Sequence, residues 1–264
     1  MFGNLARLLR YRGLISSLVA RELKARYRGS VFGFLWSFIN PLLLLLIYSF
    51  VFTTVIPNQV EGAQPYALFM FCGILPWTWF ATSLSDAAGS LIAGGNLIKK
   101  VLFPAEVLPI VNVLANMVHF FLGLVILVMF LIIYRRSPDP WDLVWFPIAV
   151  LVELVFTAAL AQALAALTVH FRDIRDILAN VMTLWFFATP IIYPHFQPNV
   201  QKFKPYFNLN PFTHLAIAYQ EILFFQGPIG HWKWLLLLGA LSVVLFLACY
   251  WVFDRLRDSF AEAV

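Results

Sequence analysis

Six long stretches of this sequence contain almost no charged residues, and short polar segments separate them. The stretches cover residues 29–60, 62–85, 107–134, 143–171, 177–201 and 234–253, and Glu153 is the one Asp, Glu, Lys or Arg within them. A helix needs about 20 apolar residues to cross a bilayer, so each stretch is long enough to span it. The pattern therefore predicts an all-α integral membrane protein with six transmembrane helices.

Basic residues cluster at the beginning of the chain. Seven of the 18 Lys and Arg residues lie in the first 28 positions: Arg7, Arg10, Arg12, Arg21, Lys24, Arg26 and Arg28. With six spans and a cytoplasmic N-terminus, the cytoplasmic segments carry thirteen Lys and Arg residues and the outer segments carry five. Basic residues concentrate on the cytoplasmic side of membrane proteins. We therefore expect both termini in the cytoplasm.

The first 30 residues are expected to form an amphipathic helix in the membrane interface. On a helical wheel, Arg7, Arg10, Arg21, Lys24 and Arg28 share one face, and Leu5, Leu8, Leu9, Val19 and Leu23 share the opposite face. Gly13 is expected to interrupt the helix, with Ser16 or Ser17 as the cap of a second part. The alternative is a charge cluster that only sets orientation. Residues 31–264 then form a single six-span domain.

The segment 194–230, which precedes the last predicted span, has a different composition. It contains five prolines, at positions 194, 198, 205, 211 and 228, and an apolar stretch that is too short to cross and includes Glu221. Two short helices, 198–207 and 211–225, are expected to form a re-entrant hairpin at the outer end of the bundle.

The overall composition excludes two other classes of protein. Hydrophobic residues make up 62% of the chain and charged residues 12%, about half the charged fraction of a soluble domain. The basic residues lie between apolar stretches, so they form no continuous surface for nucleic acid. The five histidines share no metal-ligand spacing, and we expect no metal site. Asp86, Glu153 and Glu221, in or beside apolar stretches, either have a function or pair with polar neighbours.

Several short motifs resemble those of a known family. They are RELKARYRGSVFGFLWSFINP at 21–41, GILPW at 73–77, FRDIRD at 171–176, WFFATP at 185–190 and NPF at 210–212. Taken together, in this order and over essentially the whole chain, they resemble the membrane subunits of type-2 ABC polysaccharide exporters, the O-antigen type most of all. The resemblance implies a homodimeric channel in the bacterial cytoplasmic (inner) membrane, two separate ATPase subunits, and an undecaprenyl-type lipid-linked polysaccharide as substrate. It also implies that the hairpin in 194–230 is an outer gate.

The sequence itself supports this division between channel and motor. It contains no Gly-x-x-x-x-Gly-Lys-Ser/Thr loop, and Gly94-Gly95 followed by Lys99-Lys100 lacks the glycine directly before the lysine. We therefore expect no catalytic residue and no cofactor in this chain, with ATP and Mg²⁺ bound by the partner ATPase.

The loop 91–107 on the cytoplasmic side is the candidate element for docking the ATPase. Asn96 is expected to cap a short helix that runs to Phe103, where Pro104 ends it. In the family that the chain resembles, this loop carries a coupling helix, which implies the contact residues Asn96, Leu97, Ile98, Lys99, Lys100, Val101, Leu102 and Phe103. Arg172 and Asp173 are a candidate second contact. The alternatives are an ordinary interfacial loop and a salt-bridged helix end.

Three basic and eight aromatic residues are the candidates for substrate contact. Arg21, Lys24 and Arg28 are expected to attract an anionic headgroup such as pyrophosphate. The candidates for a channel along which sugar rings slide are Tyr48, Trp77, Trp79, Phe80, Trp185, Phe186, Phe187 and Tyr193. The alternative is that Trp and Tyr lie at the membrane interfaces, as in other membrane proteins, while Phe faces lipid.

The predicted function is that of a non-catalytic permease subunit that exports an O-antigen-like, lipid-linked polysaccharide. Alternatives with the same fold are a teichoic-acid or capsule exporter and a drug or lipid exporter. An intramembrane glycosyl- or phosphotransferase would need paired acids at an interface, for which Asp173 with Asp176 is the clearest close pair. A structural membrane anchor is disfavoured by the number of spans. Association with an ATPase distinguishes the pump from the other classes.

Overall fold

The structure is a computed structural model that describes residues 11–55, 62–99, 103–136, 138–225 and 227–263. These residues form helices and turns, and no β-strand occurs among them. The helices are α2 (Arg12–Arg26), α3 (Trp36–Phe50), α4 (Tyr66–Ala93), α5 (Gly95–Ile98), α6 (Val107–Ile133), α7 (Trp145–His170), α8 (Ile174–Phe187), α9 (Pro198–Gln201), α10 (Lys204–Leu209), α11 (Pro211–Leu223) and α12 (Trp232–Ala263). The all-α prediction is confirmed.

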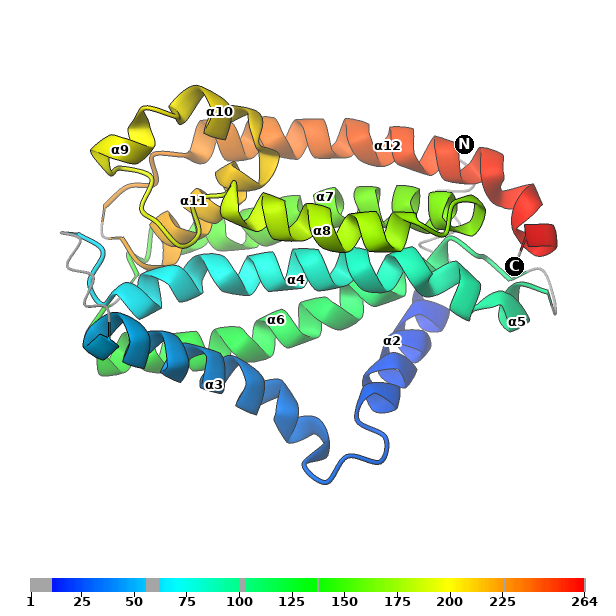
Figure 1. The fold of residues 1–264 in the computed structure, drawn as a ribbon, viewed down its shortest axis with the longest axis horizontal. Helices are drawn as coiled ribbons and strands as arrows, with labels where there is room; N and C mark the ends of the chain where they lie inside the picture. Colours follow the sequence, from blue (N-terminus) through cyan, green and yellow to red (C-terminus); the bar gives the residue numbers. More distant parts are fainter. Residues whose placement is uncertain (1–10, 56–61, 100–102, 137, 226, 264) are drawn as a thin grey trace.

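Among the described residues, five helical segments are long and apolar enough to cross a membrane. They are Gly33–Val55, Tyr66–Ala93, Val107–Ile133, Asp142–His170 and Trp232–Arg257. Short helical turns extend two of them, because Gly33–Leu35 and Val51–Val55 flank α3, and Asp142–Val144 precedes α7. These segments correspond to five of the six predicted spans, and in Figure 1 they lie side by side in one bundle.

The predicted span 177–201 is a shorter helix than expected. α8 has 14 residues and is therefore about 21 Å long, whereas the apolar part of a bilayer is about 30 Å thick. The helix ends at Phe187 because Pro190 has no backbone N–H to donate and disfavours helical backbone in the residue before it. α8 and the segment 188–197 that follows it together make the fifth passage along the bundle (Figure 1).

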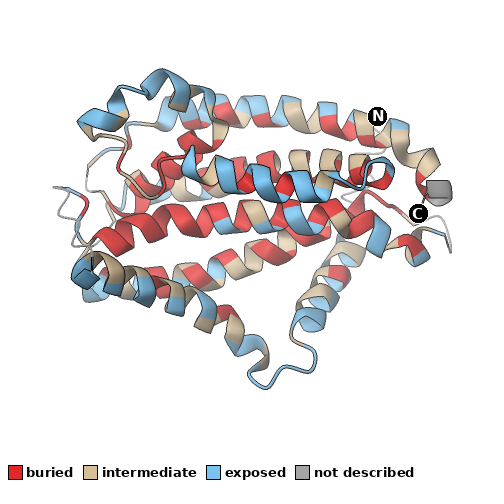
Figure 2. Ribbon diagram, viewed as in Figure 1, coloured by how far each residue is buried: buried red, intermediate tan, exposed pale blue. Residues whose placement is uncertain are grey.

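α4 forms the centre of the bundle. Within the apolar part of its span, 83% of the residues are buried, compared with 6% in the span that contains α3. α4 contacts α6, α7, α8 and α11, and Figure 2 shows it buried along most of its length. α12 packs along α7. Since α3 lies at the edge of the bundle, most of its apolar surface faces away from this chain.

The two ends of the bundle carry different elements. α5, the start of α2 and the end of α12 lie at one end, called here the α5 end, and α9 and α10 lie at the other, the α9 end (Figure 1). An even number of passages brings the first and last helices to the same end. The α5 end is the one for which the charge pattern predicts a cytoplasmic position.

The predicted outer hairpin is present as three helices, α9, α10 and α11. Nearly all of α11 is buried, and it packs against α4, α7 and α12. With 13 residues, or about 20 Å, it does not cross the bundle. It begins at Asn210, whose Oδ1 accepts a hydrogen bond from the backbone N–H of Phe212 at 3.1 Å, and Pro211 occupies its first turn. α11 is therefore a short, buried helix that does not cross the bundle, and its re-entrant position in the membrane stays a prediction.

The N-terminal helix differs from the expectation in one respect. α2 is continuous from Arg12 to Arg26, so the predicted break at Gly13 and the predicted caps at Ser16 or Ser17 are wrong. Ser17 Oγ donates instead to the Gly13 carbonyl within the helix, at 2.9 Å. One glycine costs about 1 kcal/mol in a helix, and the packing of Leu18 against α6 offsets that cost. Arg7, Arg10, Leu5, Leu8 and Leu9 lie outside the described residues.

Candidate functional site

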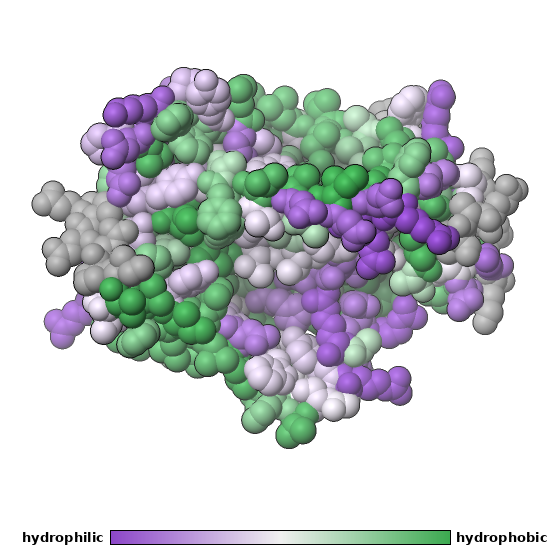
Figure 3. Space-filling view, viewed as in Figure 1, coloured by the Kyte–Doolittle hydropathy of each residue, from purple (hydrophilic) through white to green (hydrophobic). Residues whose placement is uncertain are grey.

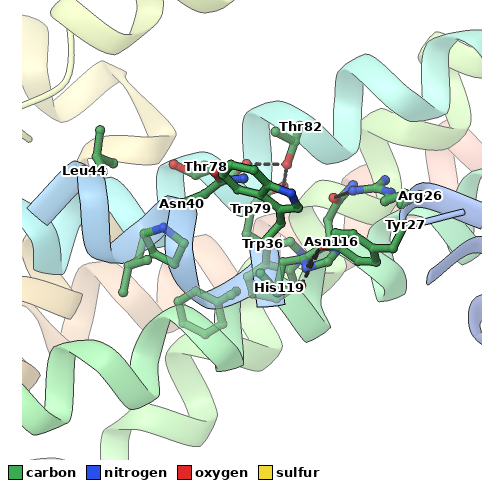
Figure 4. Close-up of a pocket in the computed structure, with 14 residues that line it drawn as sticks. Arg26, Tyr27, Trp36, Asn40, Leu44, Thr78, Trp79, Thr82, Asn116 and His119 are labelled. Atoms are coloured by element: carbon green, nitrogen blue, oxygen red, sulfur yellow. Dashed lines mark hydrogen bonds between the residues drawn. The ribbon is translucent and has the colours of Figure 1, made fainter. Parts of the chain in front are cut away.

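A cavity of about 380 Å³ lies between the α2–α3 connection on one side and α4 and α6 on the other (Figure 4). Its lining combines polar groups with aromatic rings. The polar residues are Arg26, Ser37, Asn40, Thr78, Thr82, Asn116 and His119, and the rings are Tyr27, Trp36, Trp79 and Phe120. Sugars present apolar C–H faces that pack on aromatic rings, together with hydroxyls that exchange hydrogen bonds. The cavity therefore has the chemistry of a site for a sugar with an anionic group attached.

Arg26, Asp86 and Asn116 form a closed triangle of hydrogen bonds at the wall of this cavity. Arg26 Nη2 lies 2.5 Å from Asp86 Oδ2, Arg26 Nη1 donates to Asn116 Oδ1 at 2.8 Å, and Asn116 Nδ2 donates to Asp86 Oδ2 at 2.8 Å. Glu22 Oε1, one helical turn before Arg26, lies 3.8 Å from Arg26 Nε. Bonds to charged groups are roughly twice as strong as neutral ones. The triangle thus ties α2 to α4 and α6.

Sequence reasoning did not select Arg26. On the helical wheel Arg26 lies off the basic stripe, and this is the position that faces the bundle. Asp86 was expected either to have a function or to pair with a polar neighbour, and the structure shows the pairing. A carboxylate within a span needs a partner, so an arginine outside the exposed stripe was the signal that could have identified Arg26.

The remaining polar groups of the cavity are held by bonds within the chain. The Tyr27 hydroxyl lies 2.5 Å from Ser37 Oγ and 3.4 Å from His119 Nδ1, and the rings of Tyr27 and His119 meet edge to face. Trp79 Nε1 donates to the Val113 carbonyl at 3.0 Å. These bonds keep the Trp79 ring in one orientation at the cavity wall.

A second cleft of about 370 Å³ lies on the other side of Asp86, at the α5 end. Arg21 of α2 and Arg175 of α8 both line it. A Cβ atom added to Gly89 of α4 would lie 3.3 Å from Arg175 Cζ, so the absent side chain gives the guanidinium room beside α4. Figure 3 shows hydrophilic side chains gathered over this part of the molecule, around the start of α8 and above α2.

The three predicted headgroup residues occupy different surroundings. Arg21 lines the second cleft, while Lys24 is exposed on α2 and Arg28 is exposed in the turn after it. The structure adds Arg26 and Arg175 as the basic residues that face the two cavities.

The predicted docking helix is shorter than expected. α5 covers only Gly95–Ile98 and begins at Gly94, whose carbonyl accepts hydrogen bonds from the N–H groups of Leu97 and Ile98. Asn96 lies inside this turn, so its predicted role as a cap for a helix to Phe103 is wrong. Lys99 is exposed, and the predicted contacts Lys100, Val101 and Leu102 lie outside the described residues. Arg172 and Asp173 are exposed before the start of α8.

The loop 91–107 rests on the ends of two spans. Ile98 and Phe103 pack on a cluster that includes Phe253 and Phe260 of α12. The buried Glu106 carboxylate lies 3.8 Å from Arg257 Nη1, and the Glu106 carbonyl accepts a hydrogen bond from Gln162 Nε2 of α7 at 2.8 Å. The residues at the ends of this loop are therefore in contact with both α7 and α12.

The eight candidate channel aromatics do not form one surface. Trp77 and Phe80 are buried, and both contact Phe212 of α11, with ring centroids 4.9 and 4.8 Å apart. Trp185 and Phe186 of α8 join this interior group. Trp79 lines the cavity of Figure 4, Tyr48 is half-buried on α3, Phe187 is exposed, and the hydroxyl of Tyr193 donates to the Phe187 carbonyl. The interior rings hold α8 and α11 against α4, and a channel role for the group stays a prediction.

Glu153 of α7 is fully buried inside the bundle. The Tyr219 hydroxyl of α11 is its neighbour, although the two groups do not reach hydrogen-bond geometry. This contact places a carboxyl group beside α11.

Comparison with known proteins shows similarity over nearly the whole chain. The sequence model of a family described as "ABC-2 type transporter" matches residues 13–224. The chain is 43% identical over 258 residues to "O-antigen export system permease protein RfbA" of Myxococcus xanthus, covering 97% of each chain. It is 32% identical over 249 residues to the protein of the same name from Klebsiella pneumoniae, covering 94% of each. A more distant relative is "Capsule polysaccharide export inner-membrane protein CtrC" of Neisseria meningitidis, 25% identical over 178 residues, which are 66% of this chain and 65% of that protein.

Proposed function

The chain belongs to the ABC-2 type transporter family, and we propose that it is the permease subunit of an ATP-driven exporter of an O-antigen-like, lipid-linked polysaccharide. The observation that carries this proposal is 43% identity over 97% of both chains to a protein named as an O-antigen export permease. The membrane is proposed to be the bacterial cytoplasmic membrane, with the α5 end in the cytoplasm and the α9 end outside. The excess of Lys and Arg in the segments at the α5 end supports this orientation.

The working unit is proposed to contain two copies of this chain and two ATPase subunits. The sequence has no phosphate-binding loop, which leaves ATP and Mg²⁺ to the partner. The weak burial of the α3 span within its own chain supports its contact with a second copy or with lipid. The loop 91–107, with Arg172 and Asp173, is proposed to bind the ATPase at the cytoplasmic face.

The anionic end of the lipid-linked substrate is proposed to bind beside α2. Arg26 and Arg21 supply positive charge at two adjoining cavities, and Lys24 and Arg28 add charge at the surface. Trp36, Trp79 and the threonine hydroxyls of the first cavity suit the sugars nearest the diphosphate. Because the Asp86 carboxylate already pairs with the Arg26 guanidinium, the diphosphate has to compete with this carboxylate.

Reconstitution with the partner ATPase tests the function. The chain is co-purified with a candidate ATPase subunit that carries a phosphate-binding loop, and the complex is placed in lipid nanodiscs. We expect ATP hydrolysis to be stimulated by an undecaprenyl-diphosphate-linked polysaccharide and not by undecaprenyl phosphate. Failure to recruit an ATPase would overturn the pump assignment. Equal stimulation by drugs or short lipids, without restored surface polysaccharide in a deletion strain, would overturn the assigned substrate.

A further inference from the structure

Three of the five histidines meet at the α9 end, although their positions in the sequence share no motif. His195 lies in the segment after α8, His214 in α11, and His231 directly before α12. The ring of His231 lies 6.1 Å from the ring of His195 and 5.7 Å from that of His214, measured between centroids. We call these three residues the histidine cluster.

The histidine cluster is attached to the elements around it by several contacts. Glu221 Oε2 accepts a hydrogen bond from the His231 backbone N–H at 2.9 Å, and Glu221 Oε1 lies 3.6 Å from His231 Nδ1. His214 stacks on Trp234 of α12 with centroids 4.7 Å apart, and its Nε2 lies 3.1 Å from the Asn208 carbonyl of α10. The cluster therefore joins the segment 188–197, α10 and α11 to the beginning of α12.

The surroundings of the rings favour their neutral form. Burial lowers the pKa of His195; Glu221 opposes this effect, while His231 and Lys204 add to it. Burial likewise lowers the pKa of His214, which its contact with Asn208 raises and His231 lowers. The Nδ1 atoms of His195 and His214 are buried and have no hydrogen-bond partner. A proton on either ring would thus place a positive charge among buried groups and destabilise this packing.

A proton fits this cluster better than a metal ion does. In the part of the chain that the structure describes, no group of three or more His, Cys, Asp or Glu side chains is arranged to hold a metal. Cavities of about 210 and 330 Å³ adjoin His195, with His231 and Lys204 at the first and Glu221 at the second, so the rings have space to separate.

We propose that the histidine cluster is a proton-operated contact that holds the outer hairpin on α12 while its rings are neutral and releases it when the α9 side becomes acidic. A proton on His195 or His214 places a positive charge among buried groups, about 6 Å from the ring of His231. Lys204 further opposes a positive charge on His195.

The direction of the pH dependence follows from the lowered pKa values. In the released state the rings regain the ordinary pKa of about 6.5. The contact is therefore fully present above that pH and is lost as the pH falls below it. For each unit by which the pKa of a ring is lower in the closed state than in the released state, the released population rises up to about tenfold at acidic pH.

Hydrogen exchange of the full chain with its ATPase in nanodiscs tests the proposal. Rates are measured at pH 7.5 and 5.5 by mass spectrometry and corrected for the intrinsic pH dependence of exchange. We expect the peptides that cover 188–197 and α10 to exchange at least tenfold faster at pH 5.5, and α6 to be unchanged. His195→Gln/His214→Gln, which keeps polar side chains but cannot take up a proton there, is expected to remove the difference.

Two controls separate titration from structural damage. His170→Gln removes a histidine at the α5 end, where its Nε2 lies 3.0 Å from Ser259 Oγ, and is expected to leave the outer pH response intact. Glu221→Gln removes the acid that favours protonation of the cluster and is expected to move the transition to lower pH. If the double variant does not fold, His195→Gln alone is expected to reduce the response several-fold.

Three results would overturn the proposal. The first is equal protection of 188–197 and α10 at both pH values. The second is a pH response that persists in the His195→Gln/His214→Gln variant, or, should that variant not fold, in His195→Gln at full size. The third is protection at pH 7.5 that rises with ZnCl₂ and falls with a chelator, which would show a metal site. The measurement does not depend on the exported polymer, so its failure is distinct from failure of the proposed function.

Discussion

Replacing each partner of the Arg26–Asp86 pair is expected to have opposite effects on the binding of an anionic headgroup. Asp86→Asn keeps the shape of the side chain and an acceptor oxygen, but it removes the negative charge that occupies the guanidinium. Arg26→Gln removes the positive charge itself. We therefore expect Asp86→Asn to strengthen headgroup binding and Arg26→Gln to weaken it.

The geometry sets the size of both effects. The side chains of Arg26 and Asp86 are 26% and 39% exposed, so solvent screens the pair. Its contribution to the free energy of unfolding should then be about 1 kcal/mol, and the charged hydrogen bond from Arg26 to Asn116 adds about 1.5 kcal/mol. Arg26→Gln is expected to cost about 2–3 kcal/mol of stability, and Asp86→Asn about 1 kcal/mol. Release of Arg26 by Asp86→Asn is expected to lower the half-maximal headgroup concentration up to about tenfold, which corresponds to about 1.4 kcal/mol.

The assay is substrate-stimulated ATP hydrolysis in nanodiscs that contain the permease and its ATPase. A lipid-linked diphosphate-sugar is titrated, and its half-maximal concentration is compared between variants that elute as intact complexes. Arg12→Gln is a matched control, since it removes an exposed charge at the other end of the same helix. Its half-maximal concentration is expected to stay within about twofold of the original value, because the charge is exposed and screened.

Because the two substitutions are expected to change headgroup binding in opposite directions, the assay distinguishes competition for Arg26 from a purely structural role of the pair. If Arg26 and Asp86 served only to attach α2 to α4 and α6, both substitutions would weaken headgroup binding in proportion to the stability that they cost. Weakening by Asp86→Asn as well as by Arg26→Gln would therefore reject competition between carboxylate and diphosphate. Equal binding in all variants would place the headgroup elsewhere.

Three further predictions concern the packing of the bundle and the docking loop. Asn210→Ala should reduce stability by about 2–3 kcal/mol, because it removes the cap of α11 and the acceptor for Trp185 Nε1; thermal unfolding measures this, and a loss below 0.5 kcal/mol, about the limit for a neutral surface change, would contradict it. Gly123→Ala should lower the free energy of unfolding by about 1–3 kcal/mol, since the added Cβ would lie 2.6 Å from Leu75 Cδ2. When Leu75→Ala is combined with it, thermal unfolding should show no further loss. Glu106→Gln should leave basal ATP hydrolysis intact but lower the polymer exported per ATP several-fold, and unchanged coupling would show that its contact with Arg257 transmits nothing.

The number and order of the helices in the bundle largely followed from the sequence because the membrane leaves few choices. In lipid, an apolar stretch has no water to hydrogen-bond its backbone N–H and C=O groups, so these groups bond to one another within a helix. Five of the six predicted spans are such helices among the described residues. The prolines before the last span likewise predicted short helices in place of a further span; α9 and α10 lie at the end of the bundle, and α11 packs into it. The failures are local: α8 stops before Pro190, and the docking turn begins at Gly94, where backbone geometry outweighs the apolar pattern.

The tertiary structure alone decided which polar side chains meet. Asp86 lies 60 positions after Arg26, and Asn116 lies 90 positions after it, yet the three bond to one another because α2 packs on α6, which in turn packs on α4. His195, His214 and His231 showed no ligand spacing, and they are brought together only by the return of the chain through α11 to α12. Hydropathy specifies which residues enter the membrane. The partner of a buried polar group depends on how helices pack, and the local pattern of one helix carries no record of that packing.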